Sequence, residues 1–367
     1  MKAWVLYDFG DFRLCDVEEP TDIPRGHVKL RVCTVQPSIT ESALMSGLPI
    51  YNLELVRRKL EAGPCRLFGH EFSGEVVETG EGVRDLDVGQ RVASRSLSSC
   101  GQCLLCRSGR RDECQKGPIT GFDIPGAFAE YVVVPSDSLI AIPDQISNEE
   151  GAALQALCDA VAGVSAARLR MGESTVVIGL GVMGLFCAQA ATVSGAGRVI
   201  GIDVRDQSLQ LAASFGIREI IDARTVDPVK LVLDLTDGAG AAVVFEAAGG
   251  PSEQGLGGDS MTTQAAQMAS DGGKVVGLAL PGEAAVLPYK VFRHRSIRYL
   301  FPDPLTVGLA RHVVNLVARS LIDLKPMLAP PLMGIDAIPK SFDMTANKAA
   351  FGLINPAQVT IWEGTPR

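Results

Sequence analysis

Short segments of alternating apolar and polar residues fill the first 150 residues. Residues 28–32 alternate in this way, and residues 74–78, 89–92 and 130–134 form similar runs between turns. Alternation with a period of two is typical of strands with one buried face. An irregular, mainly antiparallel β-domain is therefore expected over residues 1–150.

From about residue 151 the pattern changes to uniform apolar runs separated by helical segments. Such runs suit a parallel sheet covered on both faces, and their alternation with helices indicates an α/β fold with a doubly wound parallel sheet. The expected strands are 175–178, 199–203, 217–221, 242–245 and 274–280, and helices are expected from 182 and over 208–215. After residue 290 a strand-like piece at 297–301 and a helix at 304–321 follow.

A short inserted helix is predicted over residues 53–62, with Asn52 as its cap and Gly63-Pro64 at its end. Leu53, Val56 and Leu60 share one stripe. Two interpretations stay open: a surface helix packed by this stripe, or a lid over a substrate cleft.

The composition is that of an ordinary globular protein. Of 367 residues, 47% are apolar and 21% charged, which argues against disorder. The net charge of −8 offers no attraction to a phosphate backbone, so a small molecule is the expected partner and nucleic acid is not. No export signal precedes Asp8, and glycines interrupt the uncharged run at 174–197, which argues against a membrane span. A cytoplasmic protein with reduced thiols is expected.

A glycine-rich motif follows the first uniform apolar run. Gly179, Gly181 and Gly184 form G-x-G-x-x-G between a strand and a helix. The first allows a tight turn, the second lets backbone approach a pyrophosphate, and the third lets helix and strand pack closely. The helix start at Val182 and Met183 would offer its N–H groups to the phosphates.

Asp203 ends the next strand, 24 residues after Gly179. A carboxylate at this spacing accepts hydrogen bonds from the adenosine ribose and repels a 2′-phosphate, so NAD is expected rather than NADP. Arg205 complicates this expectation because it could reach such a phosphate. A strand–helix turn without a ligand is the alternative.

Cys100, Cys103, Cys106 and Cys114 form C-x2-C-x2-C-x7-C. Four thiolates this close can surround one zinc ion tetrahedrally, which predicts a closed structural site in a lobe at about 95–117. An iron–sulfur cluster is the alternative, and no other feature of the sequence supports it.

Together these motifs resemble the medium-chain dehydrogenase/reductase family of zinc alcohol, polyol and threonine dehydrogenases. Residues 69–71 (Gly-His-Glu), 87–92 and 126–131 carry the resemblance, with the cysteines and the glycine motif. It implies a GroES-like, mainly β catalytic domain (1–150 and 290–367) split around a Rossmann NAD-binding domain (151–289). It also implies a homodimer or homotetramer, and cofactor contacts at strand ends that include Ala248, Gly277 and Leu278.

The resemblance also implies a second, catalytic zinc, and here the chain departs from the family. Gln36 and Gln155 stand where anionic ligands are expected, beside the retained His70 and Glu71. Amides are poor zinc donors, so the catalytic metal is expected to be lost or weakened. Cys65 and Cys158 are possible substitutes or, alternatively, small buried residues.

Proton transfer would then depend on side chains, with Ser38, Glu41, His70 and Glu71 as donors or bases. Ile39 replaces the acid that orients the ligand histidine in the family, and Glu41 falls where a relay histidine often lies. A buried His–Glu pair could hold a raised pKa and act as an acid–base unit, or serve structure alone.

The leading hypothesis is an NAD-dependent oxidoreductase that interconverts a secondary alcohol (polyol, sugar, cyclitol or specialised metabolite) and its ketone. The alternatives are a zinc-independent reductase of a conjugated C=C bond and a non-catalytic NAD-binding protein.

Overall fold

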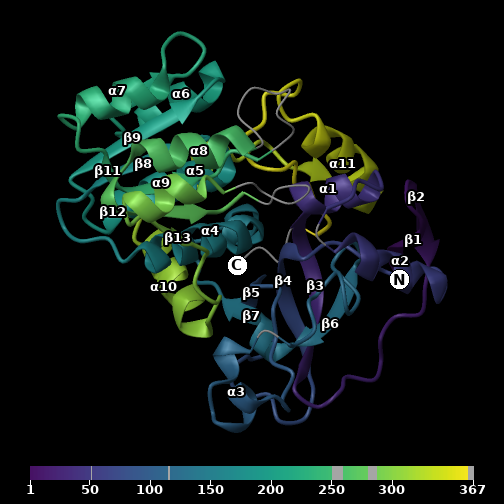
Figure 1. Ribbon diagram of the computed structural model, residues 1–367. Helices are drawn as coiled ribbons and strands as arrows, with labels where there is room; N and C mark the ends of the chain where they lie inside the picture. Colours follow the sequence, from purple (N-terminus) through teal and green to yellow (C-terminus); the bar gives the residue numbers. More distant parts are fainter. Residues whose placement is uncertain (51, 115, 250–258, 280–286, 363–367) are drawn as a thin grey trace. The chain divides into compact units, whose positions relative to one another are not determined.

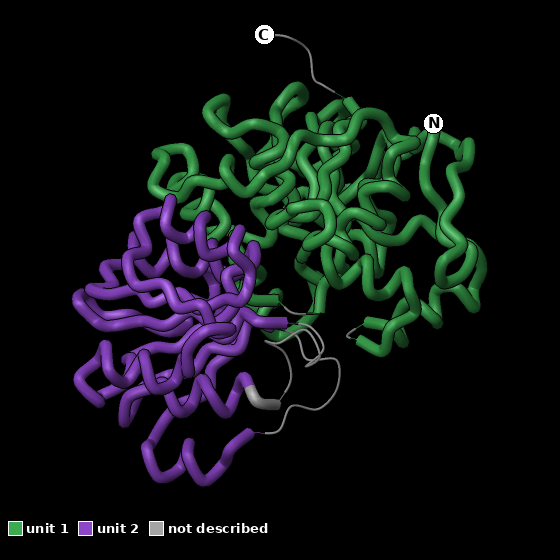
Figure 2. Tube along the Cα trace, turned by 90° about the horizontal axis from the view of Figure 1, so that it is seen from above, with its two compact units in different colours: residues 1–158, 304–367 green, residues 159–303 purple. Residues whose placement is uncertain are grey.

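The computed structural model describes residues 1–50, 52–114, 116–249, 259–279 and 287–362. The chain divides into two compact units, residues 1–158 with 304–367 and residues 159–303 (Figure 2). Both divisions lie later than the domain boundaries expected at residues 150 and 290. The first part of helix α4 (Asn148–Ala167) groups with unit 1, and the strand near residue 300 pairs within the sheet of unit 2.

Unit 1 is built on a mainly antiparallel sheet in the order β14-β15-β3-β4-β5-β7, with β6 on β3 and a separate β1-β2 hairpin (Figure 1). The strands are β1 (Lys2–Asp8), β2 (Asp11–Asp16), β3 (His27–Gln36), β4 (Glu71–Thr79), β5 (Arg91–Ser94), β6 (Tyr131–Pro135), β7 (Leu139–Ala141), β14 (Leu332–Met333) and β15 (Val359–Thr360). The helices, with the first part of α4, are α1 (Ile39–Met45), α2 (Leu53–Glu61), α3 (Leu104–Arg107), α10 (Val307–Ala318) and α11 (Ile338–Ala346). The strands expected in residues 1–150 are all confirmed.

The ends of three neighbouring strands meet in unit 1. Gln36, the last residue of β3, pairs with Glu71, the first residue of β4. On the other side of β3, Val359 of β15 pairs with Val35, which brings Gln358 level with Gln36. Residues opposite each other in antiparallel strands share one face, so a row of polar side chains crosses the sheet here. The hydrophobic core of the same unit includes the aromatic residues Phe68, Phe72 and Phe128.

Helix α2 forms as predicted, but its cap does not. Asn52 has a left-handed backbone (φ 72°) and its side chain makes no capping hydrogen bond, so the expected Asn52 cap is wrong. The stripe is real, because Val56 is fully buried and Leu53 and Leu60 pack against the core of unit 1. The Lys59 ammonium donates to the carbonyl of Asp123 at 2.6 Å. These contacts favour a packed surface helix over a lid.

Unit 2 contains a parallel six-stranded sheet in the order β10-β9-β8-β11-β12-β13. Numbered from β8, this is the order 3-2-1-4-5-6 of a doubly wound dinucleotide-binding fold. The strands are β8 (Ser174–Ile178), β9 (Arg198–Asp203), β10 (Glu219–Asp222), β11 (Ala241–Glu246), β12 (Ala269–Gly277) and β13 (Arg298–Leu300). The helices, with the rest of α4, are α5 (Val182–Val193), α6 (Asp206–Ser214), α7 (Pro228–Leu235), α8 (Asp259–Met268) and α9 (Tyr289–His294).

The strands and helices predicted from residue 151 onward are present within a few residues of their expected bounds. The strand predicted over 274–280 ends at Gly277, and its residue 280 lies outside the described residues. In the described part of the chain, none of the helices is both long and apolar enough to cross a membrane.

Candidate active site and metal centre

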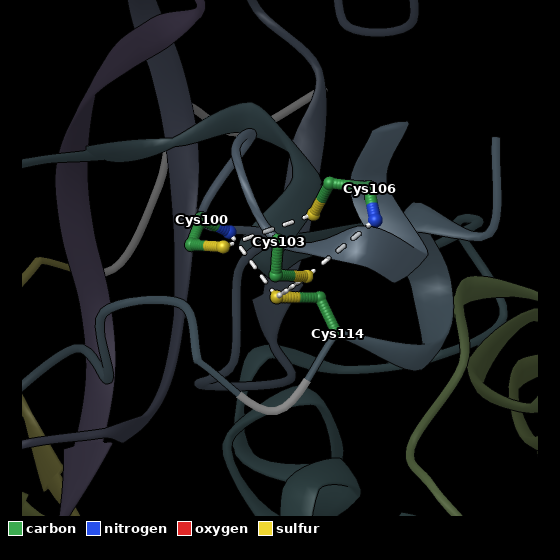
Figure 3. Close-up of side chains that lie close together, drawn as sticks. All are labelled: Cys100, Cys103, Cys106 and Cys114. Carbon is green, nitrogen blue, oxygen red and sulfur yellow. Dashed lines mark hydrogen bonds between the residues drawn. The ribbon is translucent and has the colours of Figure 1, made fainter. Parts of the chain in front are cut away.

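The four cysteines of the predicted lobe converge on one point, as Figure 3 shows. Their sulfur atoms all lie within 4.8 Å of one another. The Cys100–Cys106 and Cys103–Cys114 sulfur pairs are 3.9 and 3.8 Å apart. A zinc ion with Zn–S bonds of about 2.3 Å needs tetrahedral edges of about 3.8 Å, so this arrangement fits zinc.

Backbone N–H groups already favour thiolates in this cluster. The amides of Gln102 and Cys103 lower the pKa of the Cys100 thiol to about 6. The Cys100 amide lowers the pKa of Cys114, to which it donates at 3.3 Å. Burial raises the pKa of Cys106 to about 12, so this thiol needs a bound cation to lose its proton near neutrality.

The glycine motif of unit 2 is shaped for a dinucleotide. Gly179 has φ +85° and a Cβ there would lie 2.8 Å from the Ala248 backbone, while a Cβ on Gly184 would strike the carbonyl of Gly179 at 1.7 Å. Both positions therefore require glycine for packing. Gly181 faces open space, where the nearest atom to an added Cβ is the Arg205 guanidinium at 3.6 Å. No side chain caps α5 at Gly181, which leaves its first N–H groups free for a phosphate.

Asp203 is buried at the end of β9 and holds the glycine loop in place. Its Oδ2 accepts from the Leu180 amide at 2.6 Å, and its Oδ1 accepts from the Val204 and Arg205 amides at 2.8 and 2.9 Å. The Arg205 guanidinium lies 3.4 Å from the same Oδ1. Asp203 therefore neutralises part of the Arg205 charge, and its Oδ2, which accepts one hydrogen bond, keeps a second lone pair for a ribose hydroxyl.

At the other predicted cofactor positions the strand ends are already linked. The amide of Leu278 donates to the Glu246 carbonyl at 2.9 Å, so it is not available to a cofactor in this arrangement. A Cβ on Gly277 would strike the Tyr299 hydroxyl at 2.3 Å. That hydroxyl and the Thr262 hydroxyl lie against the buried Glu246 carboxyl at 3.2–3.3 Å. Burial raises the pKa of Glu246.

The polar row of unit 1 contains the expected acid–base residues. The Nδ1 atom of His70 lies 2.5 Å from Oε1 of Glu41, and its Nε2 lies 3.8 Å from Oε1 of Glu71. Both carboxylates and the imidazole are buried. A carboxylate at Nδ1 keeps the proton on that atom, which leaves Nε2 as the nitrogen that can exchange a proton.

Glu41 thus supplies the orienting acid that seemed lost at Ile39. Ile39 is 48% exposed at the start of α1, whereas Glu41, two residues later, is fully buried. Glu41 also accepts from the amides of Ser38 and Gly69, at 3.0 and 2.8 Å. The sequence predicts Glu41 near the site, but no local motif indicates that this carboxylate, two residues after Ile39, lies against Nδ1 of His70.

Ser38 is the N-cap of α1. Its hydroxyl oxygen accepts from the Glu41 amide at 3.0 Å, and the Glu41 side chain accepts from the Ser38 amide, which makes a capping box. The cap uses a lone pair of the oxygen, so the Ser38 hydroxyl hydrogen remains able to donate.

Two further amides belong to this site and were not expected from the sequence. The side-chain nitrogens of Asn355 and Gln358 both donate to Oε1 of Gln36, each at 2.8 Å. The nitrogen of Gln36 in turn donates to Oε2 of Glu71 at 2.5 Å. Only the pairing of β15 with β3 brings residues more than 300 positions apart together, and no local motif reports it.

This donor set does not fit a catalytic zinc. Gln36 presents N–H rather than a lone pair to Glu71. Cys65 forms a two-way backbone bridge with Leu6, and Cys158 and Gln155 are buried on α4. Among the described residues, the four-cysteine lobe is the one place where at least three His, Cys, Asp or Glu donors gather closely enough for a metal ion.

Comparison with known proteins places these features in one family. Residues 27–144 match the family model "Alcohol dehydrogenase GroES-like domain", and residues 182–301 match "Zinc-binding dehydrogenase". L-threonine 3-dehydrogenase of Bacillus licheniformis is 37% identical over 273 residues, 74% of this chain and 76% of the relative. The enzyme of the same name from Bacillus subtilis is 33% identical over 332 residues, 89% of this chain and 90% of the relative.

The fold agrees with that relationship. The crystal structure of a putative zinc-binding dehydrogenase from Sinorhizobium meliloti, bound to NADP, superposes with a TM-score of 0.81 and 27% identity over 98% of each chain. Both matched domains, the thiolate cluster and the glycine loop lead to the same assignment. The chain belongs to the medium-chain dehydrogenase/reductase family, among its zinc alcohol dehydrogenase-like oxidoreductases.

Proposed function

We propose that the protein interconverts a secondary alcohol and its ketone with NAD, and that His70, rather than a metal ion, handles the substrate proton. The observation that carries this proposal is the 2.5 Å contact between Glu41 and Nδ1 of His70. It fixes the imidazole so that Nε2 is its proton-exchanging atom. Gln36, at the position of a family ligand, offers no lone pair there.

Oxidation requires a hydride and a proton to leave the substrate separately. NAD, when bound, would supply the acceptor for the hydride, which carries both electrons of the C–H bond. The hydroxyl proton passes to Nε2 of His70 as the C=O bond forms, and the imidazole becomes a cation between Glu41 and Glu71. The Ser38 hydroxyl, at the start of the same helix as Glu41, is a candidate intermediate carrier of this proton.

NAD is proposed over NADP because Asp203 ends β9 and because Arg205, the one nearby cation in this loop, is already paired with it. Because the Sinorhizobium meliloti protein is bound to NADP, the test below measures turnover with both cofactors. The relatives are named for dehydrogenation at carbon 3 of L-threonine, a secondary alcohol. L-Threonine therefore stands beside polyols, sugars and cyclitols among the substrates proposed.

We further propose a cytoplasmic homodimer or homotetramer. Support comes from the thiol cluster, which suits a compartment that keeps cysteines reduced, and from the resemblance to family members that form such oligomers. Light scattering of the purified protein measures the subunit number directly.

The test is a screen of secondary alcohols with NAD and with NADP, read by the absorbance of the reduced nicotinamide. The proposal predicts turnover with at least one alcohol and, for His70→Gln, a loss of about 10²–10⁴-fold in kcat/KM. His27→Gln, a histidine of the same unit outside the site, should keep full activity. Reduction of a conjugated C=C bond alone, or cofactor binding without any turnover, would contradict the proposal and favour one of the two alternatives.

A further inference from the structure

We infer that Asn355 and Gln358 are positioning residues that turn the Gln36 amide so that its nitrogen faces Glu71, and that this hydrogen-bond polarity closes the position of the family's catalytic metal. The inference deepens the metal-free site of the proposed function and rests on it. Neither residue touches the reacting atoms in this account.

The direction of the network starts at two backbone carbonyls. The Asn355 nitrogen donates to the carbonyl of Pro356 at 3.0 Å, and the Gln358 nitrogen donates to the carbonyl of Glu149 at 2.8 Å. A carbonyl oxygen can only accept. Each amide must therefore present its nitrogen, not its oxygen, to these partners.

The same two nitrogens fix Gln36. Both donate to Oε1 of Gln36, which has two lone pairs and so is fully used. If the Gln36 amide turned over, its NH2 group would face two other NH2 groups and its oxygen would face the Glu71 carboxylate. All three of its side-chain hydrogen-bond contacts would become repulsive, so the surroundings select the orientation with the nitrogen toward Glu71.

Burial keeps this arrangement rigid. Gln36, Asn355 and Gln358 are 0%, 1% and 3% exposed. The side-chain oxygens of Asn355 and Gln358 are buried and have no hydrogen-bond partner within the described ranges. The direction of the network is therefore set by the contacts of the two side-chain nitrogens. The backbone pairing of β15 with β3 and of β3 with β4 fixes the positions of the neighbouring side chains in the row.

A divalent cation needs lone pairs at the place where Gln36 meets Glu71, whose other oxygen lies 3.8 Å from Nε2 of His70. It would meet an N–H group there, whose positive end repels it. A catalytic zinc takes three protein ligands and a water, and this corner offers one imidazole nitrogen and one carboxylate. A hydrogen bond from Gln36, rather than a metal ion, thus neutralises part of the Glu71 charge.

Replacing the side-chain nitrogen of Gln36 by an oxygen should open this position to a metal ion. Gln36→Glu keeps the shape of the side chain and puts an oxygen where the nitrogen was, while its other oxygen still accepts from Asn355 and Gln358. With His70 and Glu71 it makes three donors. Elemental analysis after exposure to zinc and gel filtration should give one zinc per chain for the natural protein and about two for Gln36→Glu.

Gln145→Glu is the matched control, since it adds the same charge at an exposed position, and it should stay at one zinc. Two zinc ions on the natural protein, or one on a folded Gln36→Glu variant, would overturn the inference. The readout does not depend on turnover, so a failed substrate screen leaves it intact.

The role of Asn355 and Gln358 is tested separately by zinc titration in competition with a chromophoric chelator. Asn355→Leu and Gln358→Met, singly and together, free the Gln36 amide to turn, and the double variant should bind a second zinc at least tenfold more tightly than the natural protein. Asn347→Leu, an exposed asparagine bonded to Asp343, is the control. If the folded variants, single and double, bind a second zinc ion no more tightly than the natural protein does, Asn355 and Gln358 do not orient Gln36 against a metal ion.

Discussion

Unit 1 contains two places where this family is expected to hold zinc, and they differ in donor chemistry. In the lobe, four sulfur atoms converge with the spacing of a zinc tetrahedron and with N–H groups that favour thiolates. At the ends of β3 and β4, an amide nitrogen points at Glu71, one of the two carboxylates beside His70. The comparison teaches that a metal position can be lost in the orientation of a hydrogen bond as well as in the identity of a residue.

The largest effect is expected in the lobe. Cys103→Ser should remove the bound zinc and lower the free energy of unfolding of unit 1 by several kcal/mol, because a structural zinc contributes folding energy directly. Zinc content and thermal unfolding measure this together. Cys15→Ser, a half-buried cysteine outside the lobe, should change neither. Unchanged stability after zinc loss would mean that the lobe folds without its metal.

The next effect concerns Glu41 in the polar row of unit 1. Glu41→Gln removes the charge that holds Nδ1 of His70 and should lower kcat about 10²-fold with zinc content unchanged. Glu41→Asp should recover part of the loss, and Glu54→Gln on the surface of α2 serves as the control. A loss of zinc together with activity would show that the polar row holds a metal ion and would remove the contrast with the lobe.

A smaller effect is expected at the cofactor loop. Asp203→Asn weakens the acceptor for the ribose and releases Arg205, so the ratio of kcat/KM for NAD to that for NADP should fall by roughly 10–100-fold. Asp206→Asn, on the exposed start of α6, should leave the ratio unchanged. If the ratio of the Asp203 variant also stays the same, this carboxylate only supports the loop.

The smallest effect is a pH dependence in unit 2. Burial raises the pKa of Glu246 above its ordinary value of 4.5, so folding favours the protonated form. That contribution to stability is complete below pH 4.5 and is lost as the pH rises through the raised pKa. Glu246→Gln should flatten this decline in urea unfolding followed against pH, whereas Glu219→Gln, a partly exposed strand residue, should not.

The sequence predicts the cysteine lobe well and the polar row of unit 1 only in part, for a physical reason. All four lobe ligands lie within fifteen residues, so their spacing alone indicates their convergence. The strands and the glycine loop likewise depend on local patterns. Asn355 and Gln358 reach Gln36 through pairing of β15 with β3, and no local pattern carries that contact. Glu41 reaches His70 because its position two residues after Ile39 on α1 turns its side chain inward, and Asn52 fails as a cap because its backbone is left-handed.

The most direct test of the contrast between the two sites is the zinc content of the natural protein, measured by native mass spectrometry after purification with zinc present. We expect one zinc per subunit, lost in Cys103→Ser and retained in His70→Gln. A second zinc per subunit that disappears in His70→Gln would contradict it.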